Sequence, residues 1–274
     1  MVAAQELGED VFAIHEAFAA TVHGEVLADK IRYEKYNLAH LTNEEWVGLL
    51  GSDVNNLTHM PLTCGLAKSF IHETERIGYP RLDEAEQLLL QVAAIIHDQG
   101  ESIVGDISFG DKTEADEVEE RLQFERNLEA FCPGASFEMK KVIIQARDEV
   151  AFDATTKLGR IFNAIERVGY VRTALRASSH AQNETISVAT PGLRWIVADV
   201  FSNQPVKLIE YTSDYPAVRN YLLAQQDKIK VAFNLVRPED FDNYVTNAET
   251  KRTQFNEGFA AWQHWLQNVD ASCK

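Results

Sequence analysis

The sequence has few cysteines and no long apolar run. Its 274 residues include 3 cysteines (Cys64, Cys132 and Cys273), and no two of them form a Cys-x-x-Cys pair. An odd, unpatterned set is typical of free thiols in a reducing compartment and argues against a disulfide framework. No apolar stretch approaches the length that spans a membrane, and the first residues are acidic where a signal peptide is basic. We therefore expect a cytoplasmic protein with no membrane partner.

Basic residues are also scarce. The chain has 26 Lys plus Arg against 42 Asp plus Glu, a formal net charge of −16. A nucleic-acid polymer needs clustered cations to neutralise its phosphates, so this composition argues against a DNA or RNA partner. A small anionic substrate stays compatible, because a metal ion and a few local cations can override the field of the whole chain.

Strand-like runs are almost absent, and apolar residues recur at helical spacing through most of the chain. The only run that fits a strand, residues 195–201, fits a helix equally well. The pattern predicts helices over residues 59–77, 83–98, 111–131, 137–150 and 157–177, with two further helices in residues 1–50 that end near Trp46. We therefore predict an all-α fold, a helical bundle with helical extensions at both ends.

Local signals mark several helix ends. Asp83 followed by Glu86 three positions later predicts a capping box. Gly78 and Gly100 are typical of helix stops. Ser178 to Thr190 is polar and poor in apolar residues, which favours a boundary there. We expect an N-terminal segment over residues 1–50, a core over 51–180 and a C-terminal extension over 181–274.

The chemistry-bearing feature is His97-Asp98, at the end of the apolar run from Leu88 to Ile96. Burying two such groups is unfavourable unless something pairs with them, and a metal ion is an effective partner. Adjacent residues point about 100° apart on a straight helix, so both can reach one ion only near a helix end. Gly100 supplies such an end. The segment therefore predicts a metal site.

Further ligands must come from other helices. His59 opens its helix and can reach a cleft, whereas His72 lies well inside the same helix and is expected to face solvent. No histidine occurs between Asp98 and His180, so the remaining ligand should be an acid. Glu166 is favoured because its helical neighbours are uncharged. A surface ion pair of Glu166 with Arg167 or with the turn of Arg172 is the alternative role, and Asp148 and Asp153 are the next candidate ligands.

This pattern resembles the HD-domain metal-dependent phosphohydrolases, in which a histidine, a His-Asp pair and a distant Asp bind metal on a helical bundle. Here the set is His59, His97, Asp98 and Glu166. The resemblance covers about residues 55–178. Glu166 departs from the family's last Asp, and its extra methylene changes how the carboxylate reaches an ion. Residues 181–274 lie outside the resemblance, and a cover for the site or a homodimer interface are both open roles for them.

The local sequence is similar in particular to HD-type 5′-deoxynucleotidases. Their motif His-Asp-x-x-Glu followed by Gly-Asp is matched by a short run of residues, His97, Asp98, Glu101, Gly105 and Asp106. The Arg-Trp pair that those enzymes carry ahead of the first histidine is not found. The resemblance implies a hydrolase that acts on a small phosphate ester, with nucleotides among the candidates.

A site with two histidines and two carboxylates leaves positions open on one divalent ion, such as Mn, Co, Fe, Mg, Ni or Zn. The ion lowers the pKa of its bound water. Glu101 is placed three residues after Asp98 to act as base or orienter of that water. The resemblance implies that Asp106 acts as acid or contacts the substrate. Lys112 is a candidate phosphate-binding residue, and a position on a solvated acidic face is its alternative.

Two classes of function follow. The first is a divalent-metal phosphohydrolase. The second is a non-catalytic HD-type binding or regulatory module that keeps the fold. Glu101 and Asp106 favour the enzyme, whereas Glu166 and the missing Arg-Trp pair favour the module.

Overall fold

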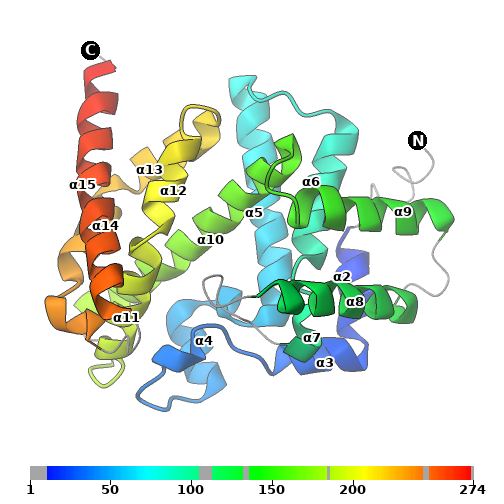
Figure 1. Ribbon diagram of the computed structural model, residues 1–274, viewed down its shortest axis with the longest axis horizontal. Coiled ribbons are helices and arrows are strands. Elements are labelled where there is room, and N and C mark those ends of the chain that lie inside the picture. Colours follow the sequence, from blue (N-terminus) through cyan, green and yellow to red (C-terminus); the bar gives the residue numbers. More distant parts are fainter. Residues whose placement is uncertain (1–10, 105–112, 132–135, 184–185, 243–246, 273–274) are drawn as a thin grey trace. The chain divides into compact units, whose positions relative to one another are not determined.

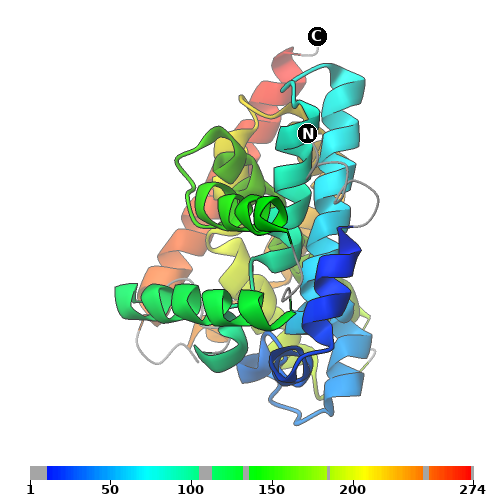
Figure 2. The same ribbon diagram turned by 90° about the vertical axis from the view of Figure 1, so that its right-hand side faces the viewer.

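The structure, a computed structural model, describes residues 11–104, 113–131, 136–183, 186–242 and 247–272. Every named element in these ranges is a helix (Figures 1 and 2). The only pairing of extended backbone found in them is an isolated antiparallel bridge between Ile31 and Asn55. The predicted all-α fold class is confirmed, and residues 195–201 lie in helix α11 (Thr190–Phe201).

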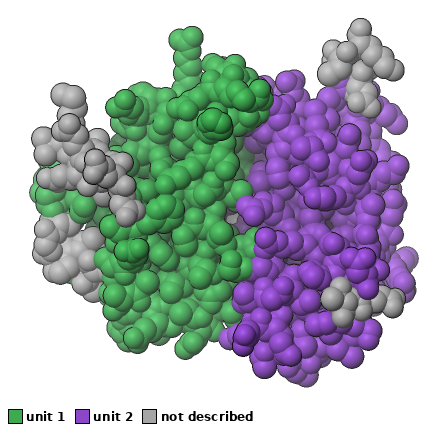
Figure 3. All heavy atoms as spheres, turned by 180° about the vertical axis from the view of Figure 1, so that it is seen from behind, with its two compact units in different colours: residues 1–32, 52–165 green, residues 33–51, 166–274 purple. Residues whose placement is uncertain are grey.

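The chain forms two compact units that are interleaved along the sequence. One unit contains residues 1–32 and 52–165, and the other contains residues 33–51 and 166–274 (Figure 3). Helix α10 (Lys157–Gln182) contributes to both units. The domain division expected from the sequence stays a prediction, because grouping by packing does not show which parts fold independently.

The first unit is built around two long helices that lie side by side, α5 (Asn56–Ile77) and α6 (Glu84–Ile96), with α8 (Glu114–Phe131) and α9 (Phe137–Ala146) crosswise to them (Figures 1 and 2). Its other elements are short: α2 (Phe12–Ala19), α3 (Val22–Ala28), η2 (Ser52–Val54), α7 (Glu101–Val104) and η3 (Arg147–Ala151). The segment predicted as one helix over 137–150 is thus α9 followed by the π-helical turn η3.

The start of α6 confirms the predicted capping box. The Asp83 carboxylate accepts a hydrogen bond from the backbone N–H of Glu86 at 2.8 Å, and the Glu86 carboxylate accepts one from the Asp83 N–H at 3.1 Å. The last turns of α6 are fully buried, from Val92 to Ile96. A helix that is apolar on all sides belongs at the centre of its unit, and α6 lies there.

Helix α5 begins earlier than the sequence pattern predicts. The side chain of Asn55 accepts hydrogen bonds from the backbone N–H groups of Leu57 and Thr58, each at 3.1 Å, and so caps the helix four positions before His59. The helix ends where predicted, with Gly78 in the left-handed region at φ 82°. The early cap places His59 at the end of the first turn of α5.

The expectation of two helices in residues 1–50 is wrong. The described part of this segment contains α2, α3, the 3-10 turn η1 (Glu34–Tyr36) and α4 (Asn43–Leu50). Thr21 caps α3, since its hydroxyl accepts a hydrogen bond from the Gly24 N–H at 3.2 Å. Thr42 and Glu45 form a capping box that starts α4. These caps interrupt an apolar periodicity that continues across them in the sequence.

The second unit also contains α12 (Gln204–Tyr211), α13 (Pro216–Ala224), α14 (Gln226–Leu235), η4 (Pro238–Phe241) and α15 (Ala248–Ser272), together with η1, α4, α11 and the later part of α10. Its core is aromatic. The Phe233 ring packs against Phe201 at 4.8 Å and against Phe255 at 5.3 Å between ring centroids. Among the helices that the structure describes, none is long and apolar enough to cross a membrane.

Candidate metal centre

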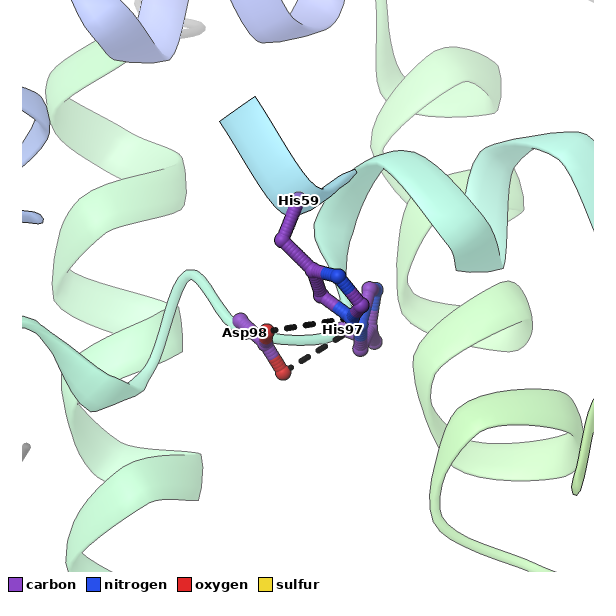
Figure 4. Close-up of side chains that lie close together, drawn as sticks. All are labelled: His59, His97 and Asp98. Carbon is purple, nitrogen blue, oxygen red and sulfur yellow. Dashed lines mark ion pairs between the residues drawn. The ribbon is translucent and has the colours of Figure 1, made fainter. Parts of the chain in front are cut away.

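Three predicted ligands meet at one point of the first unit. His59 comes from the first turn of α5, and His97 and Asp98 follow directly after α6 ends at Ile96. His97 keeps helical backbone angles, φ −57° and ψ −36°, and the regular helix ends with it. Figure 4 shows the two imidazole rings and the carboxylate turned toward one another.

The distances within this group fit a metal site. Nε2 of His97 lies 3.3 Å from Oδ1 of Asp98, and Nε2 of His59 lies 4.0 Å from Oδ2. The potential ligand atoms all lie within 4.8 Å of one another. Nitrogen and oxygen ligands sit about 2.0–2.2 Å from a transition metal, so two of them on one ion lie roughly 3–4 Å apart. Small side-chain movements would bring the three ligands to that spacing.

The hydrogen bonding of His97 leaves its Nε2 suited to bind metal. Nδ1 of this ring lies 3.0 Å from the backbone carbonyl oxygen of Ala94, to which an N–H at this position donates. With Nδ1 occupied in this way, Nε2 is the ring atom that faces Asp98 and is available to a metal ion. The ring also packs edge-on against Phe162, at 5.5 Å between centroids, and against His59 at 5.2 Å. Its orientation is therefore fixed by packing as well as by the hydrogen bond.

The second histidine is held in its neutral form. Burial lowers the pKa of His59 well below its ordinary value of 6.5, and the Arg32 guanidinium and the His97 ring lower it further. A hydrogen bond with the backbone of Asp53 acts in the opposite direction. The Thr63 hydroxyl lies 3.3 Å from Nε2. A neutral imidazole is the form that binds metal, so the site needs no proton release from this ring near neutral pH.

A short backbone bridge brings two cations to the same site. The N–H of Arg32 donates to the Val54 carbonyl at 2.7 Å, and the N–H of Asn56 donates to the Lys30 carbonyl at 3.1 Å. Since side chains alternate along extended backbone, Lys30 and Arg32 point to the same side. Nη1 of Arg32 lies 3.5 Å from Oδ2 of Asp98. Nζ of Lys30 donates to the backbone carbonyl of Glu101 at 3.1 Å.

Glu101 is buried three residues after Asp98. It opens α7, and its Oε2 accepts a hydrogen bond at 3.1 Å from Nδ2 of Asn56, a side chain with no exposed surface. The turn before it is held by Asn127 of α8, which donates to the Gln99 carbonyl at 2.8 Å. Gly100 faces the backbone of Glu120 so closely that a Cβ would lie 2.5 Å from its carbonyl oxygen. The turn from Asp98 to Glu101 is thus fixed on two sides.

The remaining predicted residues are not part of this group. Asp106 and Lys112 lie outside the described residues. Glu166 falls in the second unit, the group of three does not include it, and its role as a ligand stays a prediction. The two next candidates have partners of their own. Asp148 accepts from Nε of Arg147 at 2.8 Å, and Asp153 accepts from the Thr155 backbone N–H at 2.9 Å.

Sequence reasoning missed three residues of this neighbourhood. Arg32 is followed by Tyr33, so it does not match an Arg-Trp pair, and Lys30 and Asn56 lie in no recognisable motif. The alternation Lys30-Ile31-Arg32 is the only local signal, since it places two cations on one side of extended backbone. Its partner segment, 54–56, could not be identified from the sequence.

Comparison with protein-family models, with curated proteins and with solved structures gave no match.

Proposed function

We propose that this protein is a divalent-metal phosphohydrolase that acts on a small phosphate ester. The observation that carries the proposal is the buried group of His59, His97 and Asp98, with two cationic side chains directed at the same turn. Two imidazoles and one carboxylate match the ligand preferences of divalent transition metals, and they leave positions open for water and a substrate oxygen. Glu166 is the proposed fourth ligand.

A bound divalent ion supplies a water of lowered pKa and polarises a phosphoryl oxygen. The three side chains hold such an ion where bulk solvent is largely excluded, since the side chains of His59, His97 and Asp98 are 8%, 5% and 10% exposed. Charge interactions are stronger in such an environment than in water. The proposed site therefore favours a reaction in which negative charge grows on phosphoryl oxygens.

Arg32 and Lys30 give the proposed site its preference for an anion. A guanidinium binds phosphate oxygens with directed hydrogen bonds, and an ammonium adds a compact positive charge. Both side chains come from the bridge at residues 30–32, within reach of the turn that carries Asp98 and Glu101. They offset the net charge of −16 locally, which a small anionic substrate requires.

Glu101 is proposed as the group that accepts a proton from the attacking water. Its carboxylate is held by the amide of Asn56, which also lies one turn before His59 on α5. A buried carboxylate that is held in place three residues after Asp98 is the kind of group that can act as a general base. Asp106 as acid and Lys112 as phosphate ligand complete the proposed set.

The test is phosphate release from a panel of phosphomonoesters and nucleotides, in the presence of Mn²⁺, Co²⁺, Fe²⁺, Mg²⁺, Ni²⁺ or Zn²⁺. His59→Ala and His97→Ala are expected to abolish release from the best substrate. His72→Ala is the matched control, because His72 lies exposed on the same helix α5 as His59. Wild-type rates in the two site variants would remove the active-site assignment.

The second candidate function is a non-catalytic binding or regulatory module. The contact between Arg32 and Asp98 favours it, because this ion pair gives Asp98 a partner without any metal. A protein of this kind would bind the ion or an anion and turn over no ester in the panel. Metal binding that survives with no hydrolysis under any of the six ions would select this function.

A further inference from the structure

The Asp98 carboxylate of the candidate metal centre faces two kinds of partner, the histidine rings and an arginine. Oδ2 of Asp98 faces Nε2 of His59 at 4.0 Å and also contacts Nη1 of Arg32 at 3.5 Å. Oδ1 of the same carboxylate faces Nε2 of His97 at 3.3 Å. An ion held between Asp98 and the two rings would therefore lie close to the Arg32 guanidinium.

The charges around Asp98 balance without an ion and not with one. Asp98 contributes one negative charge and the Arg32 guanidinium one positive charge, and at the same turn Glu101 and Lys30 add one charge of each sign. A divalent ion adds two positive charges to a buried region, where the Arg32 side chain is 9% exposed. Like charges repel strongly at such distances when water is excluded. An anion at the guanidinium would relieve the excess.

We propose that Arg32 is the internal counter-ion of Asp98 in the ion-free site, and that a divalent ion and a phosphate-type oxyanion bind cooperatively because the ion displaces Arg32 from Asp98 onto the anion. The inference rests on the metal half of the proposed function and does not require hydrolysis. Coupling of this kind is reciprocal, so the anion raises the affinity for the ion by the same factor.

A purely structural role for Arg32 makes a different prediction. If the guanidinium only fastened residues 30–32 to the turn at Asp98, its removal would loosen the ligand group and weaken metal binding. If Arg32 competes with the ion, its removal strengthens metal binding and abolishes the effect of the anion. The two roles therefore differ in the sign of the change in metal affinity.

The experiment is a titration of the full chain with Mn²⁺, in which free Mn²⁺ is followed by its electron paramagnetic resonance signal, with and without inorganic phosphate. For the wild type we expect phosphate to lower the Kd of Mn²⁺ about tenfold, a coupling within the common range. For Arg32→Met we expect a Kd without phosphate about tenfold below that of the wild type, and an effect of phosphate below about twofold.

Arg147→Met is the matched control. Arg147 is also a buried arginine in contact with an aspartate, since its Nε donates to Oδ1 of Asp148 at 2.8 Å, and its Nη1 lies 3.3 Å from Oε1 of Glu125 instead of at the proposed ligands. Its Mn²⁺ affinity and phosphate effect should equal those of the wild type. Arg32→Gln gives a second test of the same change should Arg32→Met fold poorly, with circular dichroism as the check on folding.

The outcomes separate the two proposals. A folded Arg32→Met or Arg32→Gln variant that binds Mn²⁺ no more tightly than the wild type, or that keeps the full phosphate effect, overturns the exchange of Arg32. A wild-type protein that binds no Mn²⁺ overturns the metal centre and the exchange together. Hydrolysis that is absent while the coupling is present overturns only the proposed reaction.

Discussion

Two buried aspartates, one in each unit, contact an arginine, and the contact is close in one pair and long in the other. Asp240 is 2% exposed, and Nε of Arg194 lies 3.1 Å from each of its two oxygens. The backbone N–H of Arg237 donates to the same carboxylate at 2.8 Å. Asp98 is 7% exposed, and its contact with Nη1 of Arg32 is 3.5 Å long.

The neighbours of the two aspartates explain the difference. The bonds to Asp240 use donors that hold η4 and α11 of the second unit together. Both oxygens of Asp98 face imidazole nitrogens instead. A buried carboxylate that accepts several short hydrogen bonds is typical of a structural residue. A buried carboxylate that faces the nitrogens of two imidazole rings is typical of a metal-binding site.

The largest expected difference is in metal affinity. Asp98→Asn removes a ligand and the negative charge of the group, and we expect the Kd of Mn²⁺ to rise more than about 100-fold, since loss of even outer partners of metal ligands costs 10–100-fold. Asp240→Asn should leave the Kd unchanged. The measurement is titration of both variants with Mn²⁺. Equal affinities in the two variants would break the comparison.

The next difference concerns stability, and here we expect the larger effect from Asp240→Asn instead of Asp98→Asn. Asp240→Asn leaves Arg194 without its charged partner, and loss of one member of a buried pair costs about 3 kcal/mol of the free energy of unfolding. For Asp98→Asn we expect a smaller loss, about 1 kcal/mol, because one contact of 3.5 Å with Arg32 is weakened, whereas Asp240 accepts bonds of 3.1, 3.1 and 2.8 Å. Urea denaturation of the metal-free proteins measures both. A larger loss in Asp98→Asn would make Asp98 the structural residue.

Glu166 tests whether the Asp98 group needs a fourth ligand. We expect Glu166→Ala to raise the Kd of Mn²⁺ about tenfold and Glu166→Asp to raise it less, because the shorter acid keeps the carboxylate. Glu210→Ala serves as a control, since Glu210 is an exposed acid paired with Lys207. Indifference of metal affinity to both changes at Glu166 would place the fourth ligand elsewhere.

The smallest effect is a pH dependence that only the Asp98 group should show. The folded-state pKa of His59 is well below 6.5, mainly because of burial, so protonation favours the unfolded state. The contribution of His59 to stability is therefore full above pH 6.5 and is lost as the pH falls from there toward the folded-state pKa. We expect the metal-free wild type to lose about 1 kcal/mol per pH unit in this window.

The measurement is urea denaturation of the metal-free protein at pH 7.5, 6.5 and 5.5, compared with His59→Gln. The variant lacks the titrating ring, so its stability should fall less steeply over the same range. Parallel profiles in the two proteins would show that His59 is already protonated at low pH in the folded state.

The sequence predicts best what depends on local signals. The capping box at Asp83 and Glu86 and the stop at Gly78 follow from short-range chemistry, and both are observed. The His97-Asp98 pair is recognisable because two ionisable groups end an apolar run. His59 is recognisable because no other histidine opens a helix in the core.

The sequence predicts poorly what depends on pairing between distant segments. The bridge of Ile31 with Asn55 brings Lys30 and Arg32 to the site, and it involves neither periodicity nor a motif. The Asn56 amide meets Glu101 across 45 positions of the chain. The interleaving of residues 33–51 with residues 166–274 is of the same kind, because nothing local marks a segment that packs with a distant part of the chain.

The most direct test of the metal centre is the metal content of the purified full chain after reconstitution with Mn²⁺, Co²⁺, Fe²⁺ or Zn²⁺ and removal of the excess. Elemental analysis should find one divalent ion per chain in the wild type and in His72→Ala, and none in His97→Ala. A wild-type protein that retains no ion under any of these conditions would contradict the assignment of His59, His97 and Asp98 as a metal centre.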